Sequence, residues 1–246
     1  MCPMPRFFIE NLSETASFRV TGEDAHHIAR VLRMKPGESL TLCDGAGTDY
    51  LCELDCLEDG EAVCRLVEKT PSRGEPTVQA TLFMALPKGD KMDFIVQKAT
   101  ELGATTVVPY LAGRCVSRPD EKSMAKKTLR WQKIAREAAM QCGRGVIPEI
   151  RPCVSFEQAV KEATALDLSL FLYENERQNG VRTALTEQPY TKVGLMVGPE
   201  GGFEPAEAEA AERAGMQIVS LGTRILRCET APLAALTAVM YESGNL

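Results

Sequence analysis

An apolar run that ends in a glycine-rich turn lies in the last third of the chain, and it reads Val193-Gly194-Leu195-Met196-Val197-Gly198-Pro199-Glu200-Gly201-Gly202-Phe203. Such a run predicts a strand that is buried on both faces. The glycines that follow allow backbone groups to approach a ligand, because no Cβ intervenes. A tight strand-to-helix turn uses glycine equally well, so the stretch predicts either a ligand loop or a simple turn.

The pattern around this stretch repeats in both directions. Strands are expected at 78–86, 106–110, 146–150, 168–173, 192–197 and 218–221, and helices at 93–102, 121–142, 156–165, 206–214 and 231–241. This alternation predicts an α/β fold with a parallel sheet covered on both faces. Ligands bind such sheets beyond the carboxyl ends of the strands. A TIM barrel is excluded, because the first third of the chain lacks βα units.

Residues 1–74 have a different pattern. Short alternating runs at 39–43 and 62–67 are separated by turn signals such as Lys35-Pro36-Gly37 and Asp59-Gly60, and one helix is expected between Ala25 and Leu32. This pattern predicts a small β-barrel. Residues 70–76 look like a linker, so we expect one domain over 1–74 and an α/β domain over 75–246.

Composition excludes several function classes. The 246 residues include nine cysteines without a Cys-x-x-Cys pair and two histidines, His26 and His27, so neither a metal site nor a His-based triad is expected. No apolar window is long enough to span a membrane, and the N-terminus lacks the features of a secretion signal. We therefore expect a cytoplasmic protein with reduced thiols and no membrane association.

The charge is uneven along the chain. The net charge is −6, yet the stretch from Arg114 to Arg144 has nine basic and three acidic groups. This excess fits an anion-binding face, and it also fits a helix face in solvent.

A second charged segment precedes the last expected helix: Leu221-Gly222-Thr223-Arg224-Ile225-Leu226-Arg227-Cys228-Glu229-Thr230-Ala231. Charges in an apolar stretch need a partner or a ligand. An ion pair of Arg227 with Glu229, or of an arginine with Glu200, would satisfy them without any ligand. The dinucleotide and Walker glycine motifs are absent from the sequence.

Taken together, the glycine-rich turn and this charged segment closely resemble the RsmE-type 16S rRNA (uracil-N3)-methyltransferases of the SPOUT superfamily. The resemblance extends along the chain through Arg6-Phe7-Phe8, His26-His27-Ile28-Ala29-Arg30-Val31-Leu32-Arg33, Lys98-Ala99-Thr100-Glu101-Leu102-Gly103, Arg114-Cys115, Trp131-Gln132-Lys133-Ile134-Ala135 and Gln141-Cys142-Gly143-Arg144. It implies a PUA-like RNA-binding barrel at the N-terminus. It also implies a SPOUT methyltransferase domain with a C-terminal trefoil knot, and a homodimer formed through that domain.

The resemblance also implies the cofactor S-adenosyl-L-methionine and its binding residues. These are Leu172, Tyr173, Glu174, Val197, Gly198, Pro199, Glu200, Gly201, Leu221, Gly222, Ile225, Leu226, Arg227, Thr230 and Ala231. The substrate implied is a uridine of 16S rRNA in the small ribosomal subunit. Two alternatives stay open: a SPOUT enzyme that methylates a ribose 2′-hydroxyl, and an RNA-binding protein without catalysis.

Methylation of uracil N3 requires charge stabilisation on the uracil oxygens and removal of the N3 proton. Arg227 and Arg224 are the candidates for the first task, and Glu200, Glu229 or solvent for the second. The expected RNA-binding residues are all basic: Arg6, Arg30, Arg33, Arg114, Arg118, Lys126 and Arg144. We expect Trp131 to be a core residue rather than a base-stacking platform.

Overall fold

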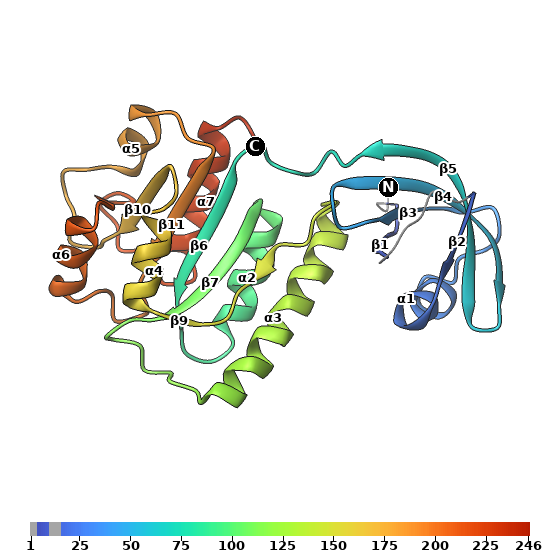
Figure 1. The fold of residues 1–246 in the computed structure, drawn as a ribbon, viewed down its shortest axis with the longest axis horizontal. Coiled ribbons are helices and arrows are strands. Elements are labelled where there is room, and N and C mark those ends of the chain that lie inside the picture. The colour runs from blue at the N-terminus through green and yellow to red at the C-terminus, as the bar shows by residue number, and fades with distance from the viewer. Residues whose placement is uncertain (1–3, 10–15) are drawn as a thin grey trace. The chain divides into compact units, whose positions relative to one another are not determined.

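The computed structural model describes residues 4–9 and 16–246, and the chain forms two compact units (Figure 1). One unit contains residues 1–75 together with Ala139–Ile147. The other contains Pro76–Ala138 and Pro148–Leu246. The unit boundary at Glu75 lies next to the predicted one, but the inclusion of Ala139–Ile147 in the first unit was not predicted.

The first unit is built around a five-stranded sheet. Its strands are β1 (Arg6–Phe8), β2 (Ser17–Val20), β3 (Ser39–Cys43), β4 (Thr48–Glu58) and β5 (Glu61–Pro71), in the order β1-β3-β4-β5-β2. All neighbours are antiparallel except β1 and β3. The short helix α1 (Gly22–His26) continues into a π-helix, η1 (His27–Val31). Alternate residues point inward, and Leu40, Leu42, Cys52 and Leu54 are fully buried.

Residues 139–147 complete a second, smaller core in this unit. Ala139 packs with Phe8 and Cys43, and Met140 and Ile147 cover the cluster. An ion pair fixes the following loop, because Arg144 Nη2 lies 2.8 Å from Glu75 Oε2 and the Arg144 side chain is only 2% exposed. The sequence has no periodic signal for these contacts, which join residues about 70 positions or more apart.

The second unit has a seven-stranded parallel sheet, which confirms the α/β prediction. Its strands are β6 (Gln79–Ala85), β7 (Ala104–Leu111), β8 (Glu149–Ile150), β9 (Val154–Ser155), β10 (Leu168–Leu172), β11 (Lys192–Val197) and β12 (Gln217–Val219). The order is β12-β10-β11-β6-β7-β8, and β9 also pairs with β7. Both β10 and β11 are almost continuously buried, as expected for a sheet covered on both faces.

Helices cover both faces of this sheet. They are α2 (Lys91–Glu101), α3 (Glu121–Cys142), α4 (Phe156–Ala163), α5 (Val181–Glu187), α6 (Pro205–Arg213) and α7 (Ala231–Glu242). Figure 1 shows α2 and α7 on one face and α4 on the other. The helix α5 was not predicted, and the strand expected at 146–150 is reduced to Glu149–Ile150, because residues 146 and 147 belong to the first unit.

Candidate active site

A pocket of about 410 Å³ lies at the carboxyl ends of β10, β11 and β12. These strands end level, because Leu172 is in register with Val197 on one side and with Val219 on the other. The segments that follow them therefore meet, as the topology rule for parallel sheets predicts. The lining includes all four predicted catalytic residues, Arg227, Glu200, Arg224 and Glu229, and every predicted cofactor residue except Thr230.

Two glycines of the first loop are required by close packing. A Cβ on Gly198 would lie 3.0 Å from the Phe203 ring, which packs against Phe171 with the ring centroids 4.0 Å apart. Gly202 has φ +66°, and a Cβ there would overlap the Glu174 carboxylate. Glycine therefore serves the turn at both positions. The same turn forms a wall of the pocket, and the ligand-loop interpretation stays a prediction.

Lys91 is a pocket residue that the sequence analysis missed. Its Nζ lies 3.1 Å from Glu200 Oε1 and 3.3 Å from Glu229 Oε2. Lys91 begins α2 just beyond the carboxyl end of β6, and β6 is the sheet neighbour of β11. The sequence holds a signal for a loop at Lys91 but none for the strand order that brings this loop to the pocket.

The ion pairs in the pocket differ from the two that the sequence suggested, Arg227 with Glu229 and an arginine with Glu200. Both glutamates pair with Lys91 rather than with an arginine. Within residues 4–9 and 16–246, Arg224 and Arg227 make no ion pair, and both line the pocket. The pocket also contains Arg177, which was not predicted. Three guanidinium groups are thus available to an anionic ligand.

Hydrogen bonds keep both glutamates ionised. Burial raises the pKa of Glu200, but hydrogen bonds from backbone N–H groups, including that of Lys88, and the Lys91 ammonium outweigh burial and lower it. The pKa of Glu229 is lowered, first by a hydrogen bond from the Cys228 thiol and also by Lys91. Burial raises the pKa of Cys228 to about 12, so the thiol keeps its proton. Carboxylates with lowered pKa values are weak bases at neutral pH, which argues against Glu200 and Glu229 in that role.

Two predicted RNA-binding arginines instead form ion pairs inside the first unit. Arg144 is buried against Glu75, so its assignment to an RNA-binding surface is wrong: its guanidinium is enclosed by protein. Arg6 Nη2 lies 2.7 Å from Asp49 Oδ2, and both side chains are at most 15% exposed. We therefore remove both residues from the proposed RNA-binding surface.

Two other predicted arginines bond to backbone carbonyls of the second unit. Arg114 donates to the Gly201 carbonyl at 2.9 Å, and Arg118 donates to the carbonyls of Ala112 and Gly113, both at 3.1 Å. Arg114 thereby supports the glycine-rich loop of the pocket. Trp131 is a core residue, as predicted: it is 2% exposed and its Nε1 donates to Asp93.

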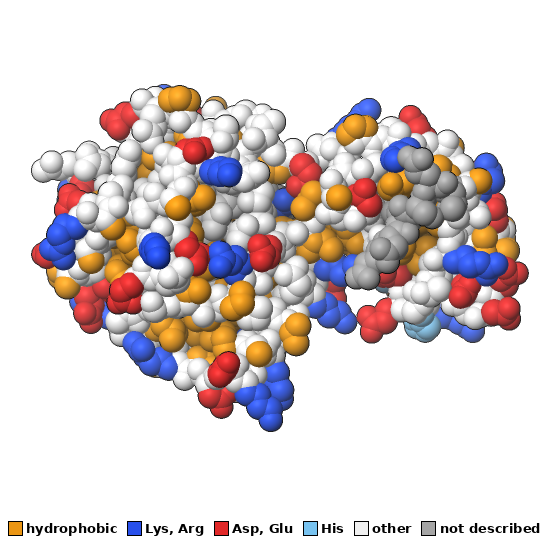
Figure 2. Space-filling view, in the orientation of Figure 1, with side chains coloured by type: hydrophobic (Ala, Val, Ile, Leu, Met, Phe, Trp, Pro, Cys, Tyr) orange, Lys and Arg blue, Asp and Glu red, His pale blue; other side chains and the backbone are white. Residues whose placement is uncertain are grey.

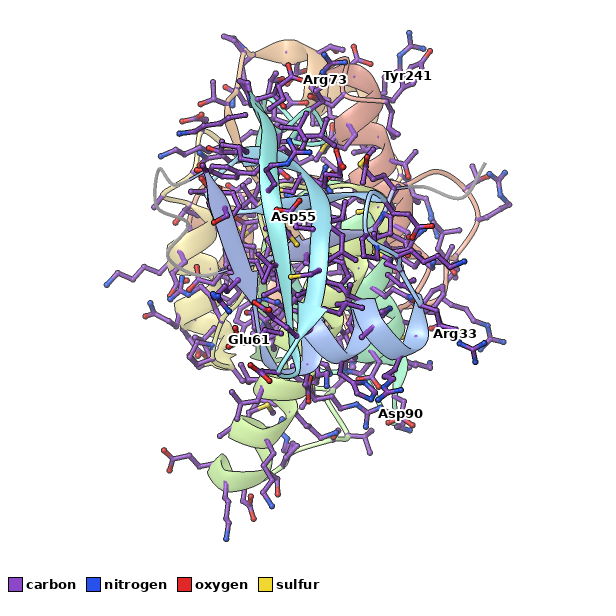
Figure 3. The ribbon with its side chains drawn as sticks, turned by 90° about the vertical axis from the view of Figure 1, so that its right-hand side faces the viewer. Arg33, Asp55, Glu61, Arg73, Asp90 and Tyr241 are labelled. Carbon is purple, nitrogen blue, oxygen red and sulfur yellow. The ribbon has the colours of Figure 1, made fainter. Side chains whose placement is uncertain are left out.

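Three predicted RNA-binding residues remain, and the described structure gives them no ion pair. Arg30, Arg33 and Lys126 form no ion pair within the described part of the chain, and Figure 3 shows the Arg33 side chain projecting away from the ribbon. On the face shown in Figure 2, Lys and Arg side chains are interspersed with Asp and Glu. This face has no continuous basic surface, so any RNA contact there depends on individual cations.

Comparisons with known proteins agree with this geometry. A family model described as an RNA methyltransferase domain matches residues 74–240, and one described as an RNA methyltransferase PUA domain matches residues 20–68. Ribosomal RNA small subunit methyltransferase E of Bacillus subtilis (strain 168) is 37% identical, over 99% of this chain and 98% of the relative. The chain belongs to the ribosomal RNA small subunit methyltransferase E family. The resemblance inferred from the sequence motifs is confirmed.

Two solved methyltransferase structures share the fold. The Neisseria gonorrhoeae methyltransferase E, crystallised with S-adenosyl methionine, superposes with a TM-score of 0.87 at 35% identity, with 97% of each chain covered. A Legionella pneumophila methyltransferase in complex with SAM gives a TM-score of 0.85 at 31% identity, also with 97% of each chain covered. As a family member, the chain is an RNA methyltransferase with a PUA-like N-terminal domain.

The described residues form neither a membrane-spanning helix nor a metal-binding cluster. No helix there combines the length and apolar character needed to cross a membrane. The same residues contain no group of three or more His, Cys, Asp or Glu side chains that could hold a metal ion.

Proposed function

We propose that this chain transfers a methyl group from S-adenosyl-L-methionine to N3 of a uridine in 16S rRNA of the small ribosomal subunit. The observation that carries the proposal is the pocket itself. Its walls include the two motif loops, and Arg224 and Arg227 line it without an ion pair to any residue that the structure describes. Relatives crystallised with the cofactor share the fold over nearly the whole chain.

The pocket lining fits the proposed cofactor. Leu172, Val197, Leu221 and Leu226 supply apolar surface, and glycine backbone supplies hydrogen-bonding groups. The Glu174 carboxylate lies against Gly202 at the pocket, where it is placed to accept hydrogen bonds from ribose hydroxyls. We propose that these residues bind the cofactor together with Tyr173, Gly198, Pro199, Glu200, Gly201, Gly222, Ile225, Arg227 and Ala231. Thr230 does not line the pocket and is left out.

The chemistry follows from the charges. When bound, S-adenosyl-L-methionine supplies an electrophilic methyl group. Loss of the N3 proton places negative charge on the uracil oxygens, and fixed guanidinium groups stabilise such charge in a partly enclosed site. Arg227 and Arg224 are assigned this role. Because Glu200 and Glu229 are weak bases, we propose that water accepts the proton.

The barrel and the free cations would bind the RNA. We propose that Arg30 and Arg33 of the barrel and Lys126 of α3 contact phosphates, because none of them has an ion pair among the described residues. Arg114 and Arg118 keep part of this role, since each still has guanidinium N–H groups beyond those bonded to backbone carbonyls.

We also propose a homodimer through the C-terminal domain. The outward side of α7 presents Leu233, Ala234, Thr237, Ala238 and Tyr241, with no charged residue among them, and Tyr241 is 73% exposed (labelled in Figure 3). An uncharged helix face of this kind is typical of a surface that another subunit covers. Sedimentation analysis of the wild type and of Tyr241→Glu tests this, with a monomeric variant expected.

We further propose that the C-terminal domain contains a trefoil knot and that the protein is cytoplasmic. Support for the knot comes from the segment after β12, which runs beside the segment after β10: Ser220 forms a parallel bridge with Gly180, and its N–H donates to the Asn179 carbonyl at 2.8 Å. An experimental backbone trace through residues 172–231 would test the knot. Support for a reducing compartment comes from the free thiols of all described cysteines.

The test of the main proposal is nucleoside mass spectrometry. The purified chain is incubated with S-adenosyl-L-methionine and small subunits from a strain that lacks this activity. We expect 3-methyluridine in the digested 16S rRNA. A ribose-methylated nucleoside would replace the proposed reaction with 2′-O-methylation, and RNA binding without any methylated product would favour the non-catalytic alternative.

A further inference from the structure

Lys91 connects two loops of the pocket that come from distant parts of the chain. Glu200 belongs to the loop after β11, and Glu229 to the segment that leads into α7. Both carboxylates lie within 3.3 Å of the same Lys91 nitrogen. We call the three side chains Lys91, Glu200 and Glu229 the carboxylate clamp.

Neighbouring groups reinforce the carboxylate clamp. The Lys88 backbone N–H donates to Glu200 Oε1 at 3.0 Å, so the loop before α2 contacts Glu200 through both backbone and side chain. The Cys228 thiol donates to Glu229 Oε2 at 3.2 Å, and Lys91 Nζ lies 3.6 Å from the Cys228 sulfur. The three side chains are only one quarter to one third exposed.

Removal of the ammonium would leave two neighbouring carboxylates without a counter-charge at a half-buried site. Like charges at such a site repel, and each disfavours ionisation of the other. The other ionisable side chains that line the pocket are Tyr173, Glu174, Arg177, Arg224, Arg227 and Cys228. The Cys228 thiol donates to Glu229, and the described structure records no ion pair of the four charged groups with the clamp glutamates. Repulsion would therefore act between the two loops that hold the cofactor.

We propose that Lys91 is a positioning residue that holds the Glu200 loop and the Glu229 segment together in the conformation that binds S-adenosyl-L-methionine. This inference rests on the proposed function. It assigns Lys91 no contact with the reacting atoms. Its signature is a pH dependence: without Lys91, the clamp carboxylates take up protons at a higher pH, and protonation of one of them removes the repulsion. The affinity lost in the variant should therefore be partly recovered as the pH falls, whereas the wild type, whose carboxylates are paired with Lys91, should show no such recovery.

Calorimetry with S-adenosylhomocysteine on the intact chain tests the proposal. Lys91→Met keeps the length of the side chain and removes the charge. Lys98→Met is the matched control, because Lys98 lies on the same helix, is 36% exposed against 33% for Lys91, and pairs with Glu101 at 2.7 Å. We expect affinity at pH 7.5 to fall about tenfold in Lys91→Met, which corresponds to about 1.4 kcal/mol. Lys98→Met should bind like the wild type.

Two further variants make the test specific. Lys91→Arg retains the charge and should bind close to wild-type levels, whereas Glu200→Gln added to Lys91→Met removes the repulsion and should recover part of the lost affinity. Wild-type affinity and an unshifted pH profile in Lys91→Met would overturn the proposal. If Lys91→Met does not fold, the Glu229→Gln variant tests the proposal instead. Unchanged affinity of Glu229→Gln for S-adenosylhomocysteine would show that the carboxylate clamp is not needed for cofactor binding. A wild-type chain that binds no S-adenosylhomocysteine would instead refute the proposed function.

Discussion

Arg144 and Arg227 both belong to the sequence stretches on which the resemblance to the methyltransferase family was based, and the structure gives them opposite environments. Arg144 is 2% exposed and paired with Glu75, whose carboxylate also accepts the N–H groups of Gly145 and Val146. Arg227 lines the pocket and has no ion pair within the described chain. An arginine with a buried partner stabilises the fold, whereas an arginine left open in a pocket is available to a ligand.

The largest expected effect is a loss of stability when the buried Arg144 is removed. Arg144→Ala leaves Glu75 in a partly buried site without its cation, and we expect a loss of about 3–5 kcal/mol in the free energy of unfolding. Urea denaturation measures it. The control is Arg151→Ala, because Arg151 pairs with Glu162 at the same 2.8 Å but is 38% exposed. That variant should lose less than about 1 kcal/mol, and equal losses in the two variants would show that burial does not decide the outcome.

The open position of Arg227 in the pocket predicts that its removal lowers catalysis and leaves the fold unchanged. In Arg227→Ala we expect methyl transfer to small subunits to fall about 100-fold, the usual cost of removing one charge-stabilising donor. Thermal unfolding should match the wild type. Arg213→Ala on α6, where the arginine is 72% exposed and paired with Glu209, serves as the control. Near-normal turnover in Arg227→Ala would remove that residue from the site.

Two glycines with the same backbone conformation allow the effect of backbone strain to be separated from the effect of a side chain in the pocket. Gly202 and Gly22 both have φ +66°, but a Cβ meets the Glu174 carboxylate at Gly202 and nothing within 4 Å at Gly22. Alanine at either position costs about 1 kcal/mol in backbone strain. We expect only Gly202→Ala to weaken S-adenosylhomocysteine binding, by about tenfold in calorimetry. Equal affinities would mean that Glu174 has no part in cofactor binding.

The Arg6–Asp49 ion pair predicts a pH effect on stability. Burial raises the pKa of Asp49, but hydrogen bonds from Arg6 and Ser72 outweigh it, so the folded-state pKa lies below the ordinary 3.8. The stabilisation is therefore complete above pH 3.8 and is lost as the pH falls through the folded pKa. Unfolding free energies at pH 7 and pH 3 should differ less in Arg6→Met than in the wild type. A variant as acid-sensitive as the wild type would contradict this assignment.

The smallest effect concerns a single surface cation. If Lys126 contacts an RNA phosphate, Lys126→Ala should lower the slope of log affinity against log salt by about 0.7–0.9, because one counterion fewer is released. Fluorescence anisotropy with an rRNA fragment measures the slope, and Lys161→Ala on α4 is the control. A slope equal to the wild type would show that Lys126 is only solvated.

The α/β alternation, the parallel sheet and the two pocket loops were predictable from the sequence. The strand and helix patterns are local, and the topology rule for parallel sheets then places the loops after β10, β11 and β12 together. Lys91 was missed because its role depends on β6 lying next to β11, and strand order is not a local property. The burial of Arg144 and the inclusion of Ala139–Ile147 in the first unit were missed for the same reason, since Glu75, Phe8 and Cys43 are distant in the sequence.

The sequence by itself determined the family, most of the helices and strands, and most of the pocket residues, because periodicity and motif spacing are local features that survive without coordinates. Only the tertiary structure decided which charged residues face a ligand and which hold the protein together. A guanidinium group has the same chemistry at Arg144, Arg114 and Arg227. Its role is set by what surrounds it: the Glu75 carboxylate, the Gly201 carbonyl or the open pocket. Those surroundings come from segments far apart in the chain, which only the folded structure brings together.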